Sequence, residues 1–541
     1  MFVKSIRRAC LLLILLPAFS FGGETDVRLT DAARNGDRAA VRSLLQQKVD
    51  VNSPALDGTT ALHWAVRADD PETVDLLIRA GANAKATDRY GITPLYLACV
   101  NGNAAMILKL LDAGADPNSV DPTGDTALMN TARTGNPDAL KVLLDRGAAV
   151  NAMDAEFQQT ALMLAVRESH PAAVKVLIEH GAMLNARTRT GPAPAFRPPC
   201  KGTGCGSEGV GINRGGLPDR GIRAATPGGM TALLYAARDG RPDETALLVA
   251  AGADVNQAEP NGITPLLMAI LNNHLDVAKF LLDHGADVNA DDFWGRTPLW
   301  AAVDLRNLDL DHGVDSGVDR GPALDFIRVL LDRGAKVNAR TREVPPGRRW
   351  LYSLGDVSWV DMTGQTPFLR ASLSGDLTLM HLLLDRGADP NIATLGGTTA
   401  LMAAAGVNWT VAQTYTVSKE ALLEAVKLCL EKGADVNATN SMGLTAVMGA
   451  ANRGSDDIIT FLVGKGARLD VKDAVGRTPV TWAEGVFLAS VGAERKPSTV
   501  ALLQRLMGNR SQNGAGGSRC GAFGILASGF WLLASFFSLR P

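Results

Sequence analysis

A period of 33 residues runs through most of the chain and limits the folds that it can adopt. The pattern Gly-x-Thr-[Pro/Ala], followed in most cases by Leu, begins at Gly58 and returns 33 residues later at Gly91. It recurs at Gly124, Gly229, Gly262, Gly295, Gly364, Gly397, Gly443 and Gly476, and Gln158 once takes the place of the Gly. A single repeat of this length cannot bury its own apolar face, so consecutive repeats must stack. The period therefore predicts a solenoid.

The repeat that begins at Gly262 illustrates how each repeat predicts two helices. Its Thr264 hydroxyl can cap a helix, and Pro265 suits the first helical position. Apolar residues at helical spacing then indicate a short helix over 266–270 and an amphipathic helix over 277–282. Gly285 follows, 23 residues after Gly262, and opens a second recurring pattern, Gly-Ala-Asp-Val-Asn. Because glycine tolerates the left-handed conformation that ends a helix, we expect Gly285 to terminate the second one.

Two short motifs resemble the hallmarks of the ankyrin repeat family. Residues 60–65 read Thr-Ala-Leu-His-Trp-Ala, and Gly-Ala-Asp-Val-Asn occurs at 252–256, 285–289 and 433–437. The resemblance covers residues 27–509, with eleven full repeats after a degenerate first one. It implies an all-α repeat fold, an ankyrin solenoid of helix-turn-helix units joined by β-hairpin fingers. It also implies a non-enzymatic scaffold that binds a protein or peptide partner through the fingers and the first helices, on a concave face.

The family's histidine is missing from most repeats, where other residues take its place. These are Tyr96, Met129, Leu267, Trp300 and Met402. We therefore expect some hydrogen bonds between repeats to be absent.

Four insertions interrupt the period, at about 191–228, 304–321, 341–360 and 406–419. Insertions that preserve the register of a repeat are typical of loops on a binding face. The first is basic, with seven Lys or Arg against two Asp or Glu between residues 187 and 225. The third carries Arg348, Arg349, Trp350, Tyr352 and Trp359, and the fourth carries Trp409. Arginine and aromatic side chains are common at protein contacts, so these residues are candidates for partner binding.

Four further aromatic residues fall at the tips of the predicted fingers, namely Tyr90, Phe157, Phe293 and Trp294. A tip in a solenoid buries little, so we expect these side chains to be exposed. With the insertions they suggest a clamp whose floor is Phe293 and Trp294, suited to a partner with an acidic rim and an apolar anchor. The competing interpretation is that the insertions fold back over apolar surface.

Both ends of the chain resemble targeting segments. Residues 1–22 combine Lys4, Arg7 and Arg8 with an apolar stretch and small residues, which is typical of a secretory signal peptide. Residues 510–519 have the composition of a flexible linker, and residues 520–539 form an uncharged stretch long enough to span a bilayer. We expect export to the periplasm or cell envelope, with membrane attachment through 520–539. The alternatives are an uncleaved N-terminal anchor and an unstructured tail.

Composition and motifs exclude several other classes of function. Lys and Arg number 54 and Asp and Glu 56, so the chain lacks the positive charge that nucleic-acid binding needs. No catalytic, cofactor-binding or metal-ligand motif is present, and His180 and His284 share one repeat position, which favours a structural role. Cys200 and Cys205 could form a disulfide in an exported finger or remain free thiols. A ligand-binding or enzymatic site built by the insertions, and a purely structural envelope protein, remain alternatives.

Overall fold

The computed structural model describes residues 26–191, 228–307, 321–343, 360–408, 417–486 and 494–514. Within these ranges the chain forms 24 helices, arranged in sequence as twelve pairs. They group into two compact bodies, an N-terminal body that contains α1–α16 and a C-terminal body that contains α17–α24. The fold class implied by the resemblance, an all-α ankyrin solenoid, is confirmed.

The N-terminal body consists of eight helix pairs. Their bounds are α1 (Arg28–Arg34), α2 (Arg38–Gln46), α3 (Ala61–Arg67), α4 (Pro71–Arg79), α5 (Pro94–Asn101), α6 (Ala104–Asp112), α7 (Ala127–Thr134), α8 (Pro137–Asp145), α9 (Ala161–Arg167), α10 (Pro171–Glu179), α11 (Ala232–Asp239), α12 (Pro242–Ala250), α13 (Pro265–Leu271), α14 (Leu275–Asp283), α15 (Pro298–Arg306) and α16 (Gly321–Asp332).

The C-terminal body consists of four pairs. Their bounds are α17 (Pro367–Ser374), α18 (Leu377–Asp385), α19 (Ala400–Ala405), α20 (Lys419–Glu431), α21 (Ala446–Arg453), α22 (Asp456–Gly464), α23 (Pro479–Ala483) and α24 (Pro497–Gly514).

The predicted threonine caps begin the first helices. The Thr264 hydroxyl accepts a hydrogen bond from the Leu267 amide, and Pro265 is the first helical residue. The same bond, from the amide three residues further on, occurs at Thr93, Thr126, Thr160, Thr231, Thr366, Thr399, Thr445 and Thr478. Gly285 has φ of 91°, in the left-handed region predicted for the end of a second helix.

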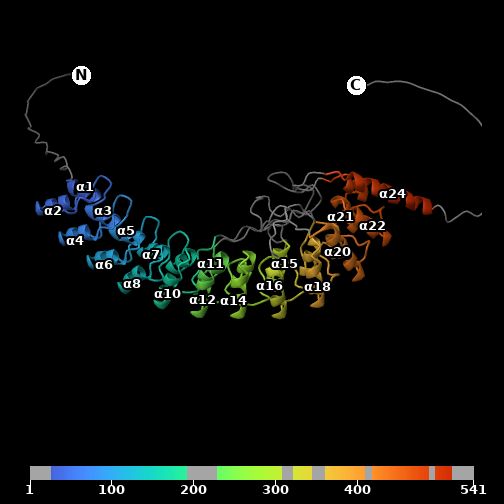
Figure 1. The fold of residues 1–541 in the computed structure, drawn as a ribbon, viewed down its shortest axis with the longest axis horizontal. Coiled ribbons are helices and arrows are strands. Elements are labelled where there is room, and N and C mark those ends of the chain that lie inside the picture. Colours follow the sequence, from blue (N-terminus) through green and yellow to red (C-terminus); the bar gives the residue numbers. More distant parts are fainter. Residues whose placement is uncertain are drawn as a thin grey trace, which may run out of the picture. The chain divides into compact units, whose positions relative to one another are not determined.

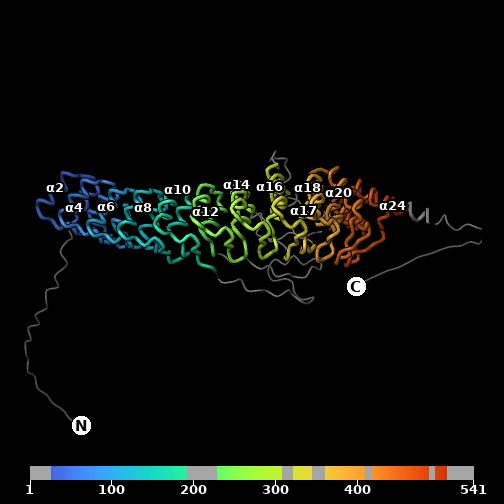
Figure 2. The backbone as a smooth tube through the Cα atoms, turned by 90° about the horizontal axis from the view of Figure 1, so that it is seen from below, coloured from blue at the N-terminus to red at the C-terminus, as the bar shows by residue number. Residues whose placement is uncertain are grey.

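First helices stack on first helices and second helices on second helices. In the N-terminal body the odd-numbered helices lie along one edge and the even-numbered helices along the other (Figure 1). Figure 2 shows the even-numbered helices of this body as one continuous row. The core lies between the two rows, where residues such as Leu95, Leu110 and Leu281 are almost fully buried. Each repeat thus completes the core of its neighbours, as the period requires.

The asparagine at the end of the Gly-Ala-Asp-Val-Asn pattern and its variants joins most repeats to the next. Asn118 donates from Nδ2 to the Gly147 carbonyl at 3.1 Å, and its Oδ1 accepts from the Ala149 amide at 2.8 Å. The same donor bond, to a carbonyl at the end of the next second helix, is made by Asn52, Asn151, Asn256, Asn289, Asn391 and Asn437. The pattern therefore encodes an inter-repeat contact as well as a helix end.

The connections between repeats are tight turns. The carboxylate of Asp88, for example, accepts from the Tyr90 and Ile92 amides at 2.8 and 2.9 Å and so folds its turn around one side chain. Consecutive tips are joined by a backbone hydrogen bond, such as Arg89 N to Asp57 O at 2.9 Å. In the described part of the chain, β pairing is limited to one isolated bridge between Val120 and Thr126.

Most of each inserted segment and both chain ends lie outside the described residues. The insertion at 304–321 comes between α15 and α16, and that at 406–419 between α19 and α20. The base of the first insertion is described: Thr188 N donates to Met230 O at 3.0 Å, and Gly229 N donates to Thr188 O at 3.2 Å. Residues 1–22 and 520–539 are not among those described. No helix within the described ranges has the length and apolar character that a membrane span needs.

Candidate functional site

An arginine stands in the last turn of the first helix in five of the first six repeats. Each stands seven residues after the helix-capping position, as Arg67 does after Thr60, and each lies in the last turn of its helix. We call the five residues the arginine row: Arg34, Arg67, Arg133, Arg167 and Arg238. The third repeat has Val100 in this position, with 49% of its surface exposed. The first helices stack along one edge of the N-terminal body (Figure 1), and the row therefore follows that edge.

Two arginines of the row flank the Trp64 ring. The Arg34 and Arg67 Cζ atoms lie 5.0 and 5.5 Å from the ring centroid. Trp64 is half-buried and both arginines are exposed. A guanidinium near an aromatic face gains electrostatic attraction from the ring, and the ring limits its motion. Both charges are therefore held in place while they remain accessible to a partner.

The sixth repeat has an equivalent arrangement around Tyr235, which occupies the same repeat position as Trp64. Arg167 and Arg238 lie 5.7 and 4.8 Å from its ring centroid. The Gln159 side-chain amide donates to the Tyr235 hydroxyl at 3.0 Å, and Arg167 donates to the Gln159 oxygen at 3.3 Å. Arg238 donates twice to Asp239, at 2.7 and 2.9 Å, and this contact raises the pKa of Arg238.

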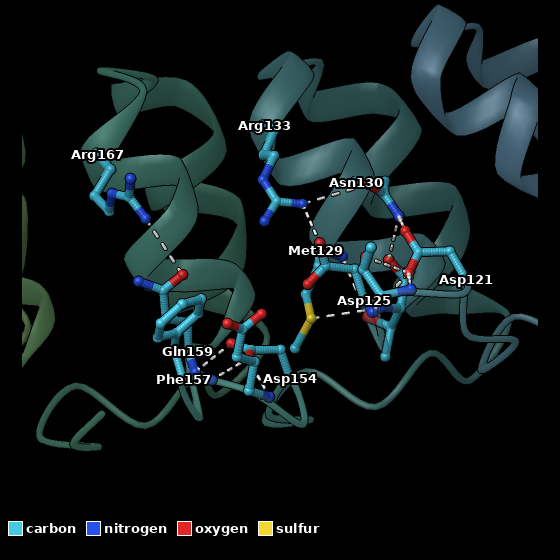
Figure 3. A network of polar contacts seen from close by, with 12 residues as sticks. Asp121, Asp125, Met129, Asn130, Arg133, Asp154, Phe157, Gln159 and Arg167 are labelled. Carbon is cyan, nitrogen blue, oxygen red and sulfur yellow. Dashed lines mark hydrogen bonds and ion pairs between the residues drawn. The ribbon is translucent and has the colours of Figure 1, made fainter. Parts of the chain in front are cut away.

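The fourth repeat connects its arginine to the carboxylates of the preceding turn. Arg133 pairs with Asp125 and lies 3.4 Å from the Asn130 side-chain oxygen, while Asn130 donates to Asp121 at 3.3 Å (Figure 3). Partial burial raises the pKa of Asp121, but hydrogen bonds from Thr123, Asp125 and Asn130 outweigh it and leave that pKa below its ordinary value. These carboxylates are thus engaged within the turn.

Two of the predicted tip aromatics are exposed beside this face. Tyr90 is 59% exposed, with Arg89 Cζ 4.6 Å from its ring centroid, and Phe157 is 55% exposed. The Phe157 amide donates to the Asp154 carboxylate, which is buried within the turn. The tip of the fifth repeat therefore presents an aromatic ring on a rigid base.

The expectation that Trp294 is exposed is wrong, because only 6% of its surface is accessible. Its ring packs edge-on against Phe293, with centroids 5.5 Å apart, and Arg296 Cζ lies 5.0 Å from the ring. The backbone amides of Arg342 and Glu343, from the next turn, both donate to the Trp294 carbonyl. Trp294 therefore cannot form the exposed floor of a clamp, whereas Phe293 is partly exposed.

Beneath Trp294 lies a buried ion pair that explains the packing. Arg296 Nε donates to the Asp292 carboxylate at 2.6 Å, and the side chains are 6% and 0% exposed. Burial raises the pKa of Asp292 despite the neighbouring Arg296. The indole covers this pair. Trp294 is therefore buried at a turn where the sequence predicted an exposed side chain.

The remaining predicted site residues lie outside the described ranges. They are Arg348, Arg349, Trp350, Tyr352, Trp359 and Trp409, together with Cys200 and Cys205. Nothing in the structure tests these predictions.

Histidines and cysteines in the described chain have structural surroundings. His63 donates from Nε2 to the Ile92 carbonyl at 3.0 Å, the inter-repeat bond expected where the family's histidine is retained, and burial lowers its pKa. The ring nitrogen of His180 contacts the Val176 carbonyl at 2.8 Å. Cys99 and Cys429 are buried, which raises the pKa of each thiol to about 12. No group of His, Cys, Asp and Glu among the described residues could hold a metal ion.

The arginine row was not predicted from the sequence, although a signal is present. Arginine recurs seven residues after the capping threonine in repeats two, four, five and six. Aligning the repeats on this threonine therefore reveals the recurring arginine. The contacts of these arginines with Trp64 and Tyr235 are not visible in the alignment, because they form between neighbouring repeats.

Comparison with known proteins agrees with this architecture. A model of three consecutive ankyrin repeats matches residues 29–121, 106–188, 217–292, 233–341 and 414–485, and a single-repeat model matches residues 363–392. These matches cover more than half of the chain, which belongs to the ankyrin repeat family.

Similarity to individual curated proteins is confined to short stretches of repeats. The chain is 40% identical to the RelA-associated inhibitor of Mus musculus over 72 residues, 13% of this chain and 9% of that protein. It is 34% identical to the tyrosine-protein kinase HTK16 of Hydra vulgaris over 88 residues, which are 16% of this chain and 12% of that protein. It is 39% identical to the protein phosphatase 1 regulatory subunit 27 of Mus musculus over 75 residues, which are 14% of this chain and 49% of that protein. The chain thus spans less than half the length of each of these relatives.

Proposed function

We propose that this chain is a non-enzymatic scaffold that binds a protein partner through the arginine row and the neighbouring turn tips. The observation that carries the proposal is the Trp64 site, where an accessible ring lies between two exposed guanidinium groups. Tryptophan and arginine are the residues most enriched at the energetic centres of protein interfaces. Two relatives also have the names of regulatory proteins, an inhibitor and a regulatory subunit.

Site-specific crosslinking tests this assignment. A photoreactive amino acid at Val100 would stand within the row, and one at Leu108 would stand on the second helix of the same repeat, where 36% of the leucine is exposed. In native cells we expect a discrete crosslinked protein from position 100 and not from position 108. Equal crosslinking at both positions, or none at position 100 in an expressed and folded chain, would place the binding surface elsewhere.

We further propose that the first insertion extends this face. Its N-terminal arm starts beside the Phe157 tip: the Arg189 amide donates to the Phe157 carbonyl at 2.7 Å, and its guanidinium donates to the Ala155 carbonyl at 2.8 Å. A partner on the tips would then also meet the basic residues of the insertion. Replacing residues 192–227 with a short Gly-Ser linker should slow association, since rim charges act mainly on the on-rate. An unchanged association rate would limit the site to the repeats.

We also propose that the scaffold acts outside the cytoplasm. The support is the basic and apolar pattern of residues 1–22 and the uncharged stretch 520–539. The mass of the mature protein should show loss of about the first 22 residues, and deletion of 520–541 should release it from the membrane fraction. An intact N-terminus on a cytosolic protein would overturn export, and a full-length protein already free of the membrane would overturn the anchor.

A further inference from the structure

The arginine row carries positive charge that the described chain only partly neutralises. Arg133 pairs with Asp125, and Arg238 pairs with Asp239. Arg34, Arg67 and Arg167 form no ion pair with any carboxylate in the described ranges; Arg34 and Arg67 lie beside the Trp64 ring, and Arg167 lies beside the Tyr235 ring and donates to the Gln159 side-chain oxygen at 3.3 Å. An arginine fork oriented by a ring keeps its donors available for a carboxylate.

The acidic residues near the row do not cancel this charge. Asp154 is buried and accepts from the backbone amides of Glu156, Phe157 and Gln159. Asp121 accepts from the Thr123 and Asp125 amides at 2.9 Å. Backbone donors therefore already occupy these carboxylates, and they are directed into the turns. Other acidic residues near the row, such as Asp31 and Glu168, are exposed, and in the described ranges neither forms an ion pair with a row arginine.

We propose that the arginine row binds an extended acidic segment of a partner protein, with its carboxylates paired to successive arginines. This proposal rests on the scaffold function proposed above and specifies the chemistry of the partner. Packed helices lie about 8–10 Å apart, and an extended chain advances about 3.3 Å per residue. One acidic residue in every three therefore matches one arginine in every repeat.

Differences between the repeats define the expected register. The six positions Arg34, Arg67, Val100, Arg133, Arg167 and Arg238 correspond to six partner residues spaced three apart. The third should be apolar, because Val100 is exposed and uncharged. Arg34 and Arg67 should contribute most, since Arg133 and Arg238 already have carboxylate partners and Arg167 donates to Gln159.

The test measures the binding of labelled 16-residue peptides to the full-length protein by fluorescence anisotropy. The first peptide has Leu at position 7 and Glu at positions 1, 4, 10, 13 and 16 in a Ser-rich background. Its reversed sequence is measured as well, because either chain direction satisfies the spacing. A second peptide has Gln in place of every Glu, and a third has the five Glu in one block. We expect the spaced peptide, in one direction, to bind at least tenfold more tightly than the other two, and the binding to weaken with added NaCl.

Two matched double variants distinguish binding by the arginine row from attraction to positive charge elsewhere on the repeats. Arg67→Gln/Arg167→Gln removes two row charges, and Arg42→Gln/Arg79→Gln removes two exposed charges from second helices. Each lost pair should weaken binding about two- to fivefold, so the row variant should lose about tenfold while the control stays within twofold. Circular dichroism checks that both variants are folded.

Each other outcome has a defined meaning. Equal binding of the spaced and blocked peptides, or equal loss in the two variants, would overturn the proposal. Tighter binding of a 16-nucleotide single-stranded DNA than of the spaced peptide would assign the row to phosphates instead. A crosslinked partner at Val100 without peptide binding would leave the scaffold function standing and reject only the acidic segment, whereas failure of both would reject both.

Discussion

The side-chain amide of Gln159 donates a hydrogen bond to the Tyr235 hydroxyl at 3.0 Å, although 76 positions separate the two residues in sequence. Two further bonds cross the same insertion, from Ser169 to Glu244 at 3.2 Å and from the Asp254 amide to Asn185 at 3.0 Å. The fifth and sixth repeats therefore stack as directly as repeats with nothing inserted between them. Arg167 and Arg238 owe their common position beside Tyr235 to this register.

A first prediction concerns the core of a single repeat. Leu281→Ala should lower the free energy of unfolding by about 2–5 kcal/mol, because the leucine is fully buried and its removal leaves a cavity. Since α14 packs on α12, α13 and α16, hydrogen exchange should rise in these helices and remain unchanged in α3 to α6. Leu56→Ala, at a fully exposed position, is the control and should have little effect. A uniform rise of exchange over the whole N-terminal body would contradict the local response.

A second prediction concerns the asparagine contact between repeats. Asn118→Ala removes the bonds to the Gly147 carbonyl and from the Ala149 amide and should cost about 1–2 kcal/mol, from two exposed hydrogen bonds. Asn118→Asp keeps the acceptor for Ala149 but places a carboxylate oxygen beside the Gly147 carbonyl, so it should lower the stability at least as much while still protecting the Ala149 amide. Urea denaturation gives the stability, and hydrogen exchange at Ala149 gives the local effect. Identical exchange at Ala149 in the alanine variant and the parent would show that the contact does not hold the repeats together.

A third prediction compares two glycines with the same backbone conformation. Gly135 and Gly147 have φ of 76° and 87°, so a side chain at either is strained. A Cβ at position 135 would lie 2.4 Å from the His170 ring, whereas one at position 147 would meet nothing within 4 Å. Gly147→Ala should therefore cost about 1–2 kcal/mol from backbone strain, and Gly135→Ala about 1–3 kcal/mol more from the clash. The extra cost should shrink in a His170→Ala background, and its persistence there would rule out the clash as its cause.

A fourth prediction concerns pH. Burial raises the pKa of Cys99 and Cys429 to about 12 in the folded chain, above the value of about 8.5 for a free thiol. Each neutral thiol therefore contributes stability that is fully present below about pH 8.5 and is lost as the pH rises towards 12. A thiol reagent at pH 8 should label neither residue until the protein unfolds. The Cys99→Ala/Cys429→Ala variant should lose less stability than the parent over this window. Rapid labelling of Cys99 or Cys429 in the native chain, located by peptide mapping, or an equal loss of stability in the variant and the parent, would contradict the burial of these two thiols.

The features that could be predicted from the sequence are those set by residue spacing within a single repeat. A threonine cap, a glycine helix end and an apolar residue at helical spacing act within one repeat, and Thr264, Gly285 and Leu281 have the predicted structures. The burial of Trp294 was not predictable in this way, because it depends on Arg342 from the next turn, about 50 positions later. The arginine row is similar: Trp64 receives one guanidinium from its own repeat and one from the preceding repeat. Side-chain burial and contacts that depend on a neighbouring repeat therefore cannot be predicted from the sequence of one repeat alone.

Because the base of the first insertion is closed, the sequence of the insertion can change without moving the repeats on either side. Thr188 and Met230 meet through their backbones, and the Thr188 hydroxyl also accepts from the Met230 amide at 2.9 Å. The closure entropy of a loop rises by only about 0.6 kcal/mol for each doubling of its length. Residues between these two positions can therefore be gained, lost or replaced at small cost to folding, while the distance between Arg167 and Arg238 stays fixed. In related chains this would allow the loop to diversify for different partners beside a constant row of charges.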